Sequence, residues 1–132
     1  MNKKSIPVKL DKVWKVFKDP QAKKDVVAVE NADFTIQPGE LVTLLGPSGC
    51  GKTTTLRMIA GFELPTQGRI MIGDSDVTYL APNQRDTAMV FQSYGLFPHM
   101  NVFENVAYGL KIRKVPKDDI KKKVTEFLGL VG

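Results

Sequence analysis

The eight residues from Gly46 to Thr53 constrain the fold more than any other part of this 132-residue sequence. They read Gly-Pro-Ser-Gly-Cys-Gly-Lys-Thr, with glycines at the first and sixth positions and Lys-Thr directly after the second of these. The apolar run 41–45 before them is typical of a strand buried on both faces of a sheet. Residues 52–60 after them predict a helix that ends at Gly61. A glycine-rich loop between a buried strand and a helix predicts an α/β fold.

This loop has the chemistry to hold a polyanion. Glycines let the backbone turn sharply and present its N–H groups, and the helix directs its positive dipole end to the same place. The pattern G-x-x-x-x-G-K-[ST] is that of a phosphate-binding loop (P-loop), so we expect ATP with Mg²⁺ as cofactors. Lys52 would contact the β- and γ-phosphates, the Thr53 hydroxyl Mg²⁺, and Thr54 the α-phosphate. The predicted nucleotide contacts in this loop are Gly46, Ser48, Gly49, Cys50, Gly51, Lys52, Thr53 and Thr54.

The simplest alternative is a glycine-rich turn that precedes a helix by chance. The predicted strand and helix on either side favour phosphate binding instead. Cys50 is the only cysteine, so the chain forms no internal disulfide and suits a reducing compartment. We expect its backbone to take part in binding, and thiol reagents to block nucleotide binding by their bulk.

The N-terminal half is rich in predicted strands. Residues 8–17 and 26–36 predict two strands joined by the polar loop 18–24, which suggests an antiparallel pair. Residues 69–72 predict a short strand before a Gly73-Asp74 turn, and residues 88–91 predict a further buried strand. The interpretation is a P-loop NTPase core with an N-terminal antiparallel β subdomain, in a domain that spans residues 1–92.

The last third, residues 93–132, predicts the start of a helical subdomain. Asn101 can cap a helix, with Glu104 three residues later as its reciprocal partner. The sequence Val115-Pro116 ends that helix, and residues 117–128 predict another. The apolar residues expected to be buried are Val102, Val106 and Leu110 on the first helix and Ile120, Val124, Phe127 and Leu128 on the second.

Composition and charge exclude some classes of protein. No apolar run approaches the ~18 residues of a membrane span, and the basic N-terminus lacks the apolar stretch of a secretory signal, so we expect a cytosolic protein. The net charge is +5, with eight of nineteen basic residues at positions 1–24 and seven at 111–123. Solvated lysine faces explain these clusters better than nucleic acid, since no nucleic-acid-binding motif accompanies them. Attraction to an anionic membrane surface is a further alternative.

Beyond the P-loop, several stretches resemble the nucleotide-binding subunits of ATP-binding cassette (ABC) transporters. The similarity runs from about Leu10 to the C-terminus and is far more specific than the P-loop alone. Its style is that of importers of sugars, polyamines, ferric iron or phosphonates. The matching stretches are residues 46–61, Gly68-Arg69-Ile70, Asp76-Val77-Thr78, Val90-Phe91-Gln92-Ser93-Tyr94-Gly95-Leu96-Phe97-Pro98-His99 and Asn101-Val102-Phe103-Glu104-Asn105-Val106.

This resemblance implies roles that the residues alone leave open. Gln92 matches the Q-loop glutamine, which contacts Mg²⁺ or the attacking water; the alternative is an ordinary strand end. With Lys52 it completes the predicted catalytic residues. Phe17 matches the aromatic residue that stacks on adenine, with Trp14 as its rival and core packing as the alternative for both. His99, the only histidine, does not match the family's switch histidine, and we interpret it as a loop residue at the partner interface.

The resemblance also implies partners and a location. Residues Ser93 to Asn105 would receive transmembrane permease subunits, and a second ATP-binding subunit would complete the site. The protein would then lie in the cytoplasm, on the inner face of the plasma membrane.

The 132 residues contain no Leu-Ser-Gly-Gly-Gln signature, no Asp-Glu at the end of an apolar strand and no switch histidine. We therefore expect a truncated cassette that binds Mg-ATP but hydrolyses it poorly. Open strand edges predict a homo-oligomer. The alternatives are a half-domain that binds nucleotide or self-associates without turnover, an ABC protein of DNA repair or translation, and a small-molecule P-loop kinase. The resemblance of Phe91 to Asn105 to importer subunits argues against the last two.

Overall fold

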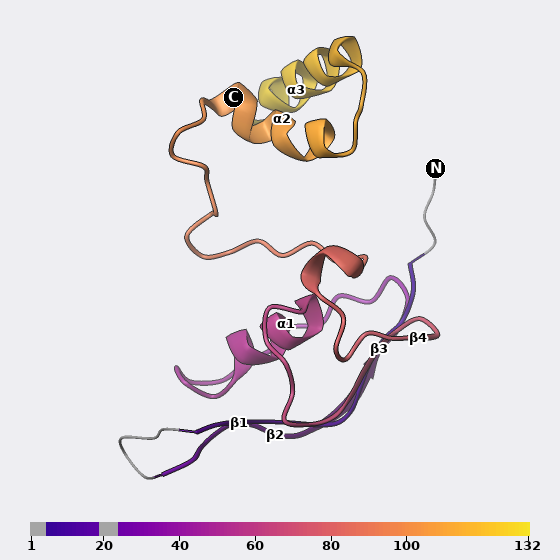
Figure 1. Ribbon diagram of the computed structural model, residues 1–132, viewed down its shortest axis with the longest axis vertical. Coiled ribbons are helices and arrows are strands. Elements are labelled where there is room, and N and C mark those ends of the chain that lie inside the picture. The colour runs from indigo at the N-terminus through magenta and orange to yellow at the C-terminus, as the bar shows by residue number, and fades with distance from the viewer. Residues whose placement is uncertain (1–4, 19–23) are drawn as a thin grey trace. The chain divides into compact units, whose positions relative to one another are not determined.

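The computed structural model describes residues 5–18 and 24–132, and the chain forms two compact units (Figure 1). The first unit ends at Met89 and the second begins at Val90. Most of the loop predicted at residues 18–24 lies outside the described residues.

The first unit contains a four-stranded antiparallel sheet in the order β2-β1-β3-β4. Its strands are β1 (Val8–Phe17), β2 (Val26–Ile36), β3 (Gln67–Ile72) and β4 (Ser75–Asp76). The predicted antiparallel pairing of the first two strands is confirmed. It begins with Val8 opposite Ile36 and ends with Phe17 opposite Val26.

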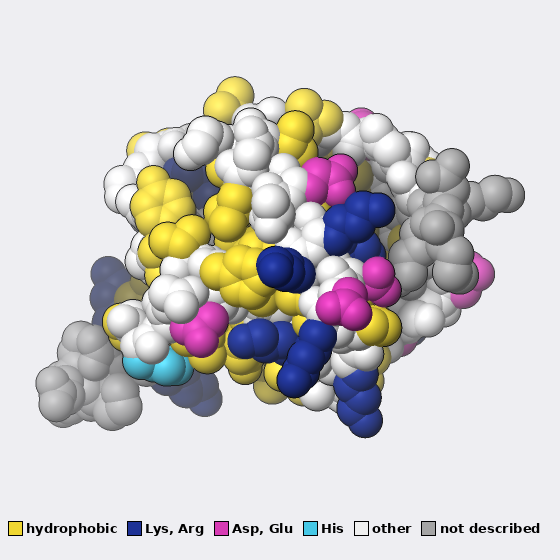
Figure 2. Space-filling view, turned by 90° about the horizontal axis from the view of Figure 1, so that it is seen from above, with side chains coloured by type: hydrophobic (Ala, Val, Ile, Leu, Met, Phe, Trp, Pro, Cys, Tyr) yellow, Lys and Arg dark blue, Asp and Glu magenta, His cyan; other side chains and the backbone are white. Residues whose placement is uncertain are grey.

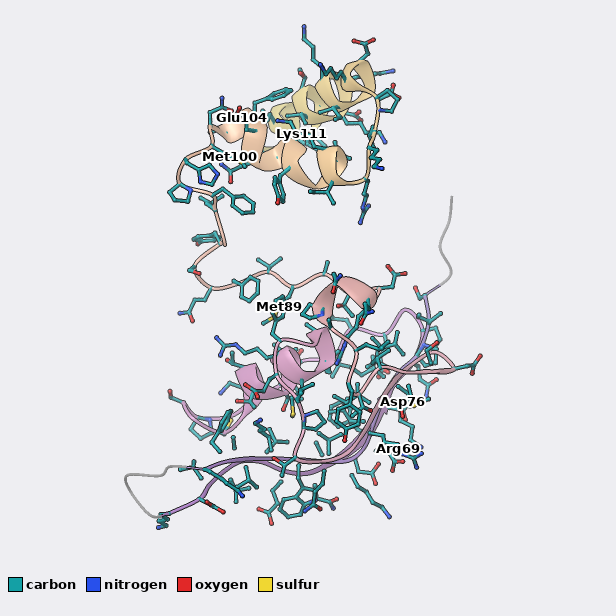
Figure 3. All side chains as sticks on the ribbon, in the orientation of Figure 1. Arg69, Asp76, Met89, Met100, Glu104 and Lys111 are labelled. Atoms are coloured by element: carbon teal, nitrogen blue, oxygen red, sulfur yellow. The ribbon has the colours of Figure 1, made fainter. Side chains whose placement is uncertain are left out.

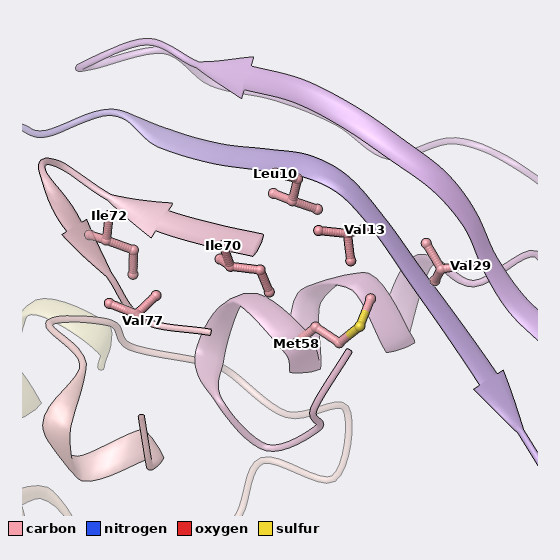
Figure 4. Close-up of a cluster of buried hydrophobic side chains, with 7 residues drawn as sticks. All are labelled: Leu10, Val13, Val29, Met58, Ile70, Ile72 and Val77. Carbon is pink, nitrogen blue, oxygen red and sulfur yellow. The ribbon is translucent and has the colours of Figure 1, made fainter. Parts of the chain in front are cut away.

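Helix α1 (Lys52–Ala60) covers one face of this sheet (Figure 1), and its bounds confirm the predicted helix. Gly61 ends it in the left-handed conformation, as expected. The fully buried Met58 of α1 packs against apolar side chains from the sheet (Figure 4). This buried cluster consists of Leu10, Val13, Val29, Met58, Ile70, Ile72 and Val77.

A bulge at Lys12 changes the alternation of β1. Lys12 has a positive φ of 51°, and the pairing register of β1 shifts there against both β2 and β3. Leu10 and Val13 are therefore both fully buried although they are three positions apart. After the bulge, Val13 packs with Met58 of α1, and alternation along the strand predicts Trp14 on the opposite face.

Asp76 stabilises the turn that follows β4. Its carboxylate accepts hydrogen bonds from the backbone N–H and the hydroxyl of Thr78, and that hydroxyl accepts from the Ile70 N–H. The pKa of Asp76 is lowered, first by the Thr78 hydroxyl, then by the Thr78 N–H and, less, by the positive charge of Arg69. Arg69 and Asp76 belong to the neighbouring strands β3 and β4 (Figure 3).

Two predicted strands are wrong: residues 41–45 and 88–91 form no strand. Leu41 is 94% exposed, Leu45 87% and Val90 88%. A strand requires a neighbour with which to exchange backbone hydrogen bonds, and neither segment pairs with the described sheet. Their apolar composition predicts burial, but only a neighbouring strand can provide it.

The second unit is a pair of helices, α2 (Val102–Ile112) and α3 (Lys117–Val131). The predicted cap is confirmed, because the Asn101 side chain accepts from the Glu104 N–H at 2.8 Å and Glu104 accepts from the Asn101 N–H at 3.1 Å. The buried core consists of Ala107, Ile120 and Val124, with Leu110, Val115 and Leu128 partly buried around it.

The predicted burial of Val102, Val106 and Phe127 is wrong, since they are 66%, 41% and 58% exposed. α2 meets α3 through the small Ala107 instead, and these larger residues stay at the surface. Figure 2 shows one face of the molecule, on which exposed hydrophobic side chains lie beside lysines and arginines. Among the described residues, no helix has the length and apolar character needed to cross a membrane.

Candidate functional site

The P-loop depends on glycines in conformations that other residues adopt with strain. Gly49 and Gly51 have φ values of 83° and 87°. Gly51 also lies against β2: a Cβ atom at this position would be 2.1 Å from the carbonyl oxygen of Ala28. The sheet and the loop therefore fix each other's position at Gly51.

Lys52 reaches back across the loop that precedes it. Its ammonium group donates to the carbonyl oxygens of Gly46 and Pro47, both at 2.7 Å, and contacts the Cys50 Sγ at 3.3 Å. These contacts hold a full positive charge on the concave side of the glycine-rich loop, where a phosphate oxygen can replace loop carbonyls as its partner.

The start of α1 lacks a side-chain cap. Its N-cap is Gly51, which has no side chain, and no acidic residue lies in the first turn. The first N–H groups of a helix then remain available to an anion. A hollow of about 390 Å³ opens here, lined by Ser48, Gly49, Gly51, Lys52, Thr53 and Thr54. The structure thus brings together most of the predicted phosphate contacts around one concave surface.

A second hollow, of about 510 Å³, lies between β2 and the same loop. Val27 and Glu30 line it from β2, and Gly49, Cys50 and Lys52 from the P-loop.

Phe17 lies at the end of β1. It pairs with Val26, the residue before Val27, and is 41% exposed. The ammonium group of Lys15 lies 4.7 Å from the centroid of the Phe17 ring. Because side chains alternate along a strand, Phe17 is expected on the same side of β1 as the buried Val13, and Trp14 on the other side.

A Mg²⁺ ion at this loop could be held by the loop itself or by acidic, histidine and cysteine side chains in the part of the chain that the structure describes. No group of three or more His, Cys, Asp or Glu residues lies close enough there to hold a metal ion. The exposed Thr53 hydroxyl, next to Lys52 at the head of α1, can contribute one oxygen ligand. A Mg²⁺ ion at this site would take most of its ligands from phosphate and water, which is how Mg²⁺ commonly binds.

Arg85 has a structural role in this unit that the sequence pattern does not predict. Its side chain is buried, with 6% exposed, and its guanidinium donates to four backbone carbonyls. The acceptors are Met58 at 2.7 Å, Ile59 at 2.9 Å, Leu80 at 2.9 Å and Thr78 at 3.1 Å. Burial lowers the pKa of Arg85. Arg85 therefore ties the last turn of α1 to the segment 78–80, at the opposite end of the helix from the P-loop.

Gln92 belongs to the second unit, where it is exposed. It lies within a turn in which the Tyr94 N–H donates to the Phe91 carbonyl at 2.9 Å. Gln92 is thus in a different unit from the P-loop, and its proposed contact with Mg²⁺ or water stays a prediction.

Asn105 organises the segment between Gln92 and α2. Its side chain accepts from the Phe97 N–H at 2.9 Å and donates to the carbonyls of Phe97, Met100 and Asn101. The Phe97 ring packs against Tyr108 of α2, with 4.5 Å between centroids, and against His99 at 6.1 Å. Tyr94 and Leu96 remain 78% and 68% exposed. The segment is therefore an ordered loop that presents two apolar side chains to solvent.

The family model described as "ABC transporter" matches residues 29–132. The chain is 56% identical over 124 residues to the spermidine/putrescine import ATP-binding protein PotA of Thermobifida fusca, covering 94% of this chain and 32% of that protein. It is 60% identical over 105 residues to the Fe(3+) ions import ATP-binding protein FbpC 1 of Rhizobium meliloti, covering 80% of this chain and 30% of that one.

Among solved structures, the dimeric bacterial ABC transporter cassette MJ0796 is similar, with a TM-score of 0.81 and 28% identity. The similarity covers 90% of this chain and 54% of the cassette. A post-hydrolysis state of the same cassette, bound to ADP and Pi, gives a TM-score of 0.74.

The fold and the P-loop define a nucleotide-binding α/β protein with an antiparallel β subdomain and a helical part. The chain belongs to the ABC transporter family. It spans about a third of the length of the curated relatives that it matches.

Proposed function

We propose that this chain is the Mg-ATP-binding part of an ABC importer ATPase, which couples ATP binding and hydrolysis to solute uptake. The observation that supports this most directly is the Lys52 ammonium group, hydrogen-bonded at 2.7 Å to two carbonyls of the loop that it closes. It lies at the start of a helix without a side-chain cap. A cation and free helical N–H groups around one hollow suit a polyphosphate. The importer assignment rests on the relatives described above.

In this proposal, the triphosphate lies against the backbone of residues 46–54. Lys52 neutralises charge on the β- and γ-phosphates, Thr53 provides a hydroxyl to Mg²⁺, and Thr54 contacts the α-phosphate. The adenine ring stacks on Phe17, which pairs with Val26 and is 41% exposed. Gln92 contributes a ligand to Mg²⁺ or to the attacking water.

The proposal extends to partners and turnover. The loop 93–105, with its exposed Tyr94 and Leu96, contacts permease subunits at the inner face of the membrane. A second ATP-binding subunit completes the site. The 132 residues alone bind Mg-ATP without appreciable hydrolysis, because phosphoryl transfer requires several positioned groups together.

A second candidate is a half-domain that only self-associates. The exposures of Leu41 and Leu45, 94% and 87%, favour a covering partner for the segment before the P-loop. Sedimentation of the 132-residue chain measures its oligomeric state, and titration calorimetry measures its Mg-ATP binding. A homo-oligomer that binds no nucleotide supports this candidate, and Mg-ATP binding supports the first.

Replacing Lys52 by alanine tests the proposed ligand. Hydrogen bonds to charged groups contribute about 1.5–3 kcal/mol each, so we expect Mg-ATP affinity to fall by about 30-fold or more. Titration calorimetry with Mg-ATP measures this, with the exposed Lys9→Ala on β1 as the matched control. Undiminished affinity of Lys52→Ala would mean that the nucleotide binds elsewhere.

A further inference from the structure

Lys15 is less exposed than the other basic residues on β1. Its side chain is only 14% exposed, whereas Lys9 and Lys12 are exposed. Lysine side chains seldom remain this buried unless specific partners hold them. The partners of Lys15 therefore indicate what it does.

Two of these partners come from the segment after α1. The Lys15 ammonium group forms an ion pair with Glu63 at 2.6 Å and donates to the Leu64 carbonyl at 2.9 Å. Both contacts tie the side chain to the segment that follows α1, and together they fix the position of its charge.

The third partner is the Phe17 ring, 4.7 Å from the ammonium group to the centroid. A cation over an aromatic face is attracted by the ring's quadrupole. One face of Phe17 is thereby held against Lys15, while 41% of the residue remains exposed. The ring is both oriented and accessible.

The backbone near Phe17 is held by different contacts. Thr66 donates its N–H to the Trp14 carbonyl at 2.7 Å, and its hydroxyl accepts from the Val16 N–H at 3.0 Å. The strand end is therefore anchored without Lys15. What Lys15 adds is the orientation of one side chain.

We propose that Lys15, held by Glu63, is a positioning residue that orients Phe17 as the platform for the nucleobase. This rests on the proposed function, in which adenine stacks on Phe17. Lys15 does not contact the phosphates in this arrangement. Its influence should therefore appear in the recognition of the base and not in that of the triphosphate.

The test compares ATP with inorganic tripolyphosphate, both with Mg²⁺, on the 132-residue chain. Lys15→Met retains the aliphatic stem and removes the charge. We expect ATP affinity to fall about three- to fivefold, the size of a partly exposed cation–π contact, and tripolyphosphate affinity to stay within twofold. Glu63→Gln, which weakens the anchor of Lys15, should lower ATP affinity by a smaller factor than Lys15→Met does. Tripolyphosphate affinity should again stay within twofold. Lys9→Met should change neither.

Phe17→Ala tests the positioning role of Lys15 separately from the proposed stacking of adenine on Phe17. If Lys15 acts through the ring, Lys15→Met has no further effect on ATP affinity in the Phe17→Ala background. Equal loss of ATP and tripolyphosphate in Lys15→Met, or no loss of either, overturns the positioning role alone. If Phe17→Ala binds ATP as the unmodified chain does, base stacking on Phe17 is wrong, and the role of Lys15 with it.

Discussion

The two units of this molecule are held together in different ways. The first, residues 1–89, combines strands from distant parts of the sequence and buries a cluster of seven apolar residues. The second, residues 90–132, joins two consecutive helices over a core of three buried residues. The first unit therefore depends on contacts between distant residues, whereas the second depends on local signals such as its capping box.

Each unit also contains one polar side chain that fixes a loop through four hydrogen bonds to the backbone. In the first unit this is Arg85, which is charged and 6% exposed. In the second it is Asn105, which is neutral and only partly buried. The number of hydrogen bonds is equal, so burial and charge should determine which residue contributes more to stability.

We expect the largest effect from Arg85→Met. It leaves carbonyls at the end of α1 and in residues 78–80 without their donor, so the first unit should lose about 3–5 kcal/mol of unfolding free energy. Urea unfolding measures this, and hydrogen exchange should show that the amides of α2 and α3 keep their protection. Arg57→Met, at an exposed position of α1, is the control. A loss below about 1 kcal/mol would mean that the burial of Arg85 does not make it contribute more to stability than Asn105 does.

A pair of glycine substitutions should affect the two units in opposite directions. Gly51→Ala introduces a Cβ atom 2.1 Å from the Ala28 carbonyl at a φ of 87°, so we expect a loss of about 2–4 kcal/mol and weaker Mg-ATP binding. Gly109→Ala, within α2, meets nothing within 4 Å and should stabilise the second unit by up to about 1 kcal/mol. Thermal unfolding of both variants measures the difference. Equal effects of the same sign would contradict it.

The sequence predicts the parts of this fold that are determined locally. The P-loop pattern places α1 and its end at Gly61, and Asn101 with Glu104 predicts the start of α2. The antiparallel pairing of β1 and β2 follows from alternation and a short connection. Each of these features depends on residues a few positions apart or on one turn.

The parts that the sequence does not predict depend on distant partners. The run 41–45 has a strand's composition, but its strand character depends on a neighbour that the pattern cannot specify. The bulge at Lys12, which decides which face Phe17 occupies, has no glycine to mark it. Arg85 appears in the sequence as one arginine of a polar loop, because its acceptors at Met58 and Ile59 are 26 or more positions away.

In the second unit, Asn105→Ala tests the neutral counterpart of Arg85. The variant frees the backbone groups of Phe97, Met100 and Asn101, which solvent can partly reach, so we expect a loss of about 1–2 kcal/mol, less than for Arg85→Met. Urea unfolding followed by the helical signal of α2 and α3 measures it. Asn83→Ala, at an exposed position of the first unit, is the control. A loss as large as that of Arg85→Met would show that hydrogen-bond number outweighs burial.

The smallest effect should come from Asp76→Ala, because this carboxylate is exposed and its interactions are screened by solvent. The pKa of Asp76 is lowered in the folded chain, chiefly by the Thr78 hydroxyl. Its stabilisation is therefore present above the unfolded-state pKa of about 3.9 and disappears as the pH falls through the folded-state value. We expect Asp76→Ala to lose less than about 1 kcal/mol at pH 7, and the difference from the unmodified chain to narrow at an acidic pH below the unfolded-state pKa. Urea unfolding at both pH values measures this, with the exposed Asp74→Ala as control. A difference in unfolding free energy that stays constant with pH would show that the hydrogen bonds of Asp76 do not depend on its charge. The charged Asp76 of the first unit would then stabilise its turn in the same way as the neutral Asn105 stabilises its loop in the second.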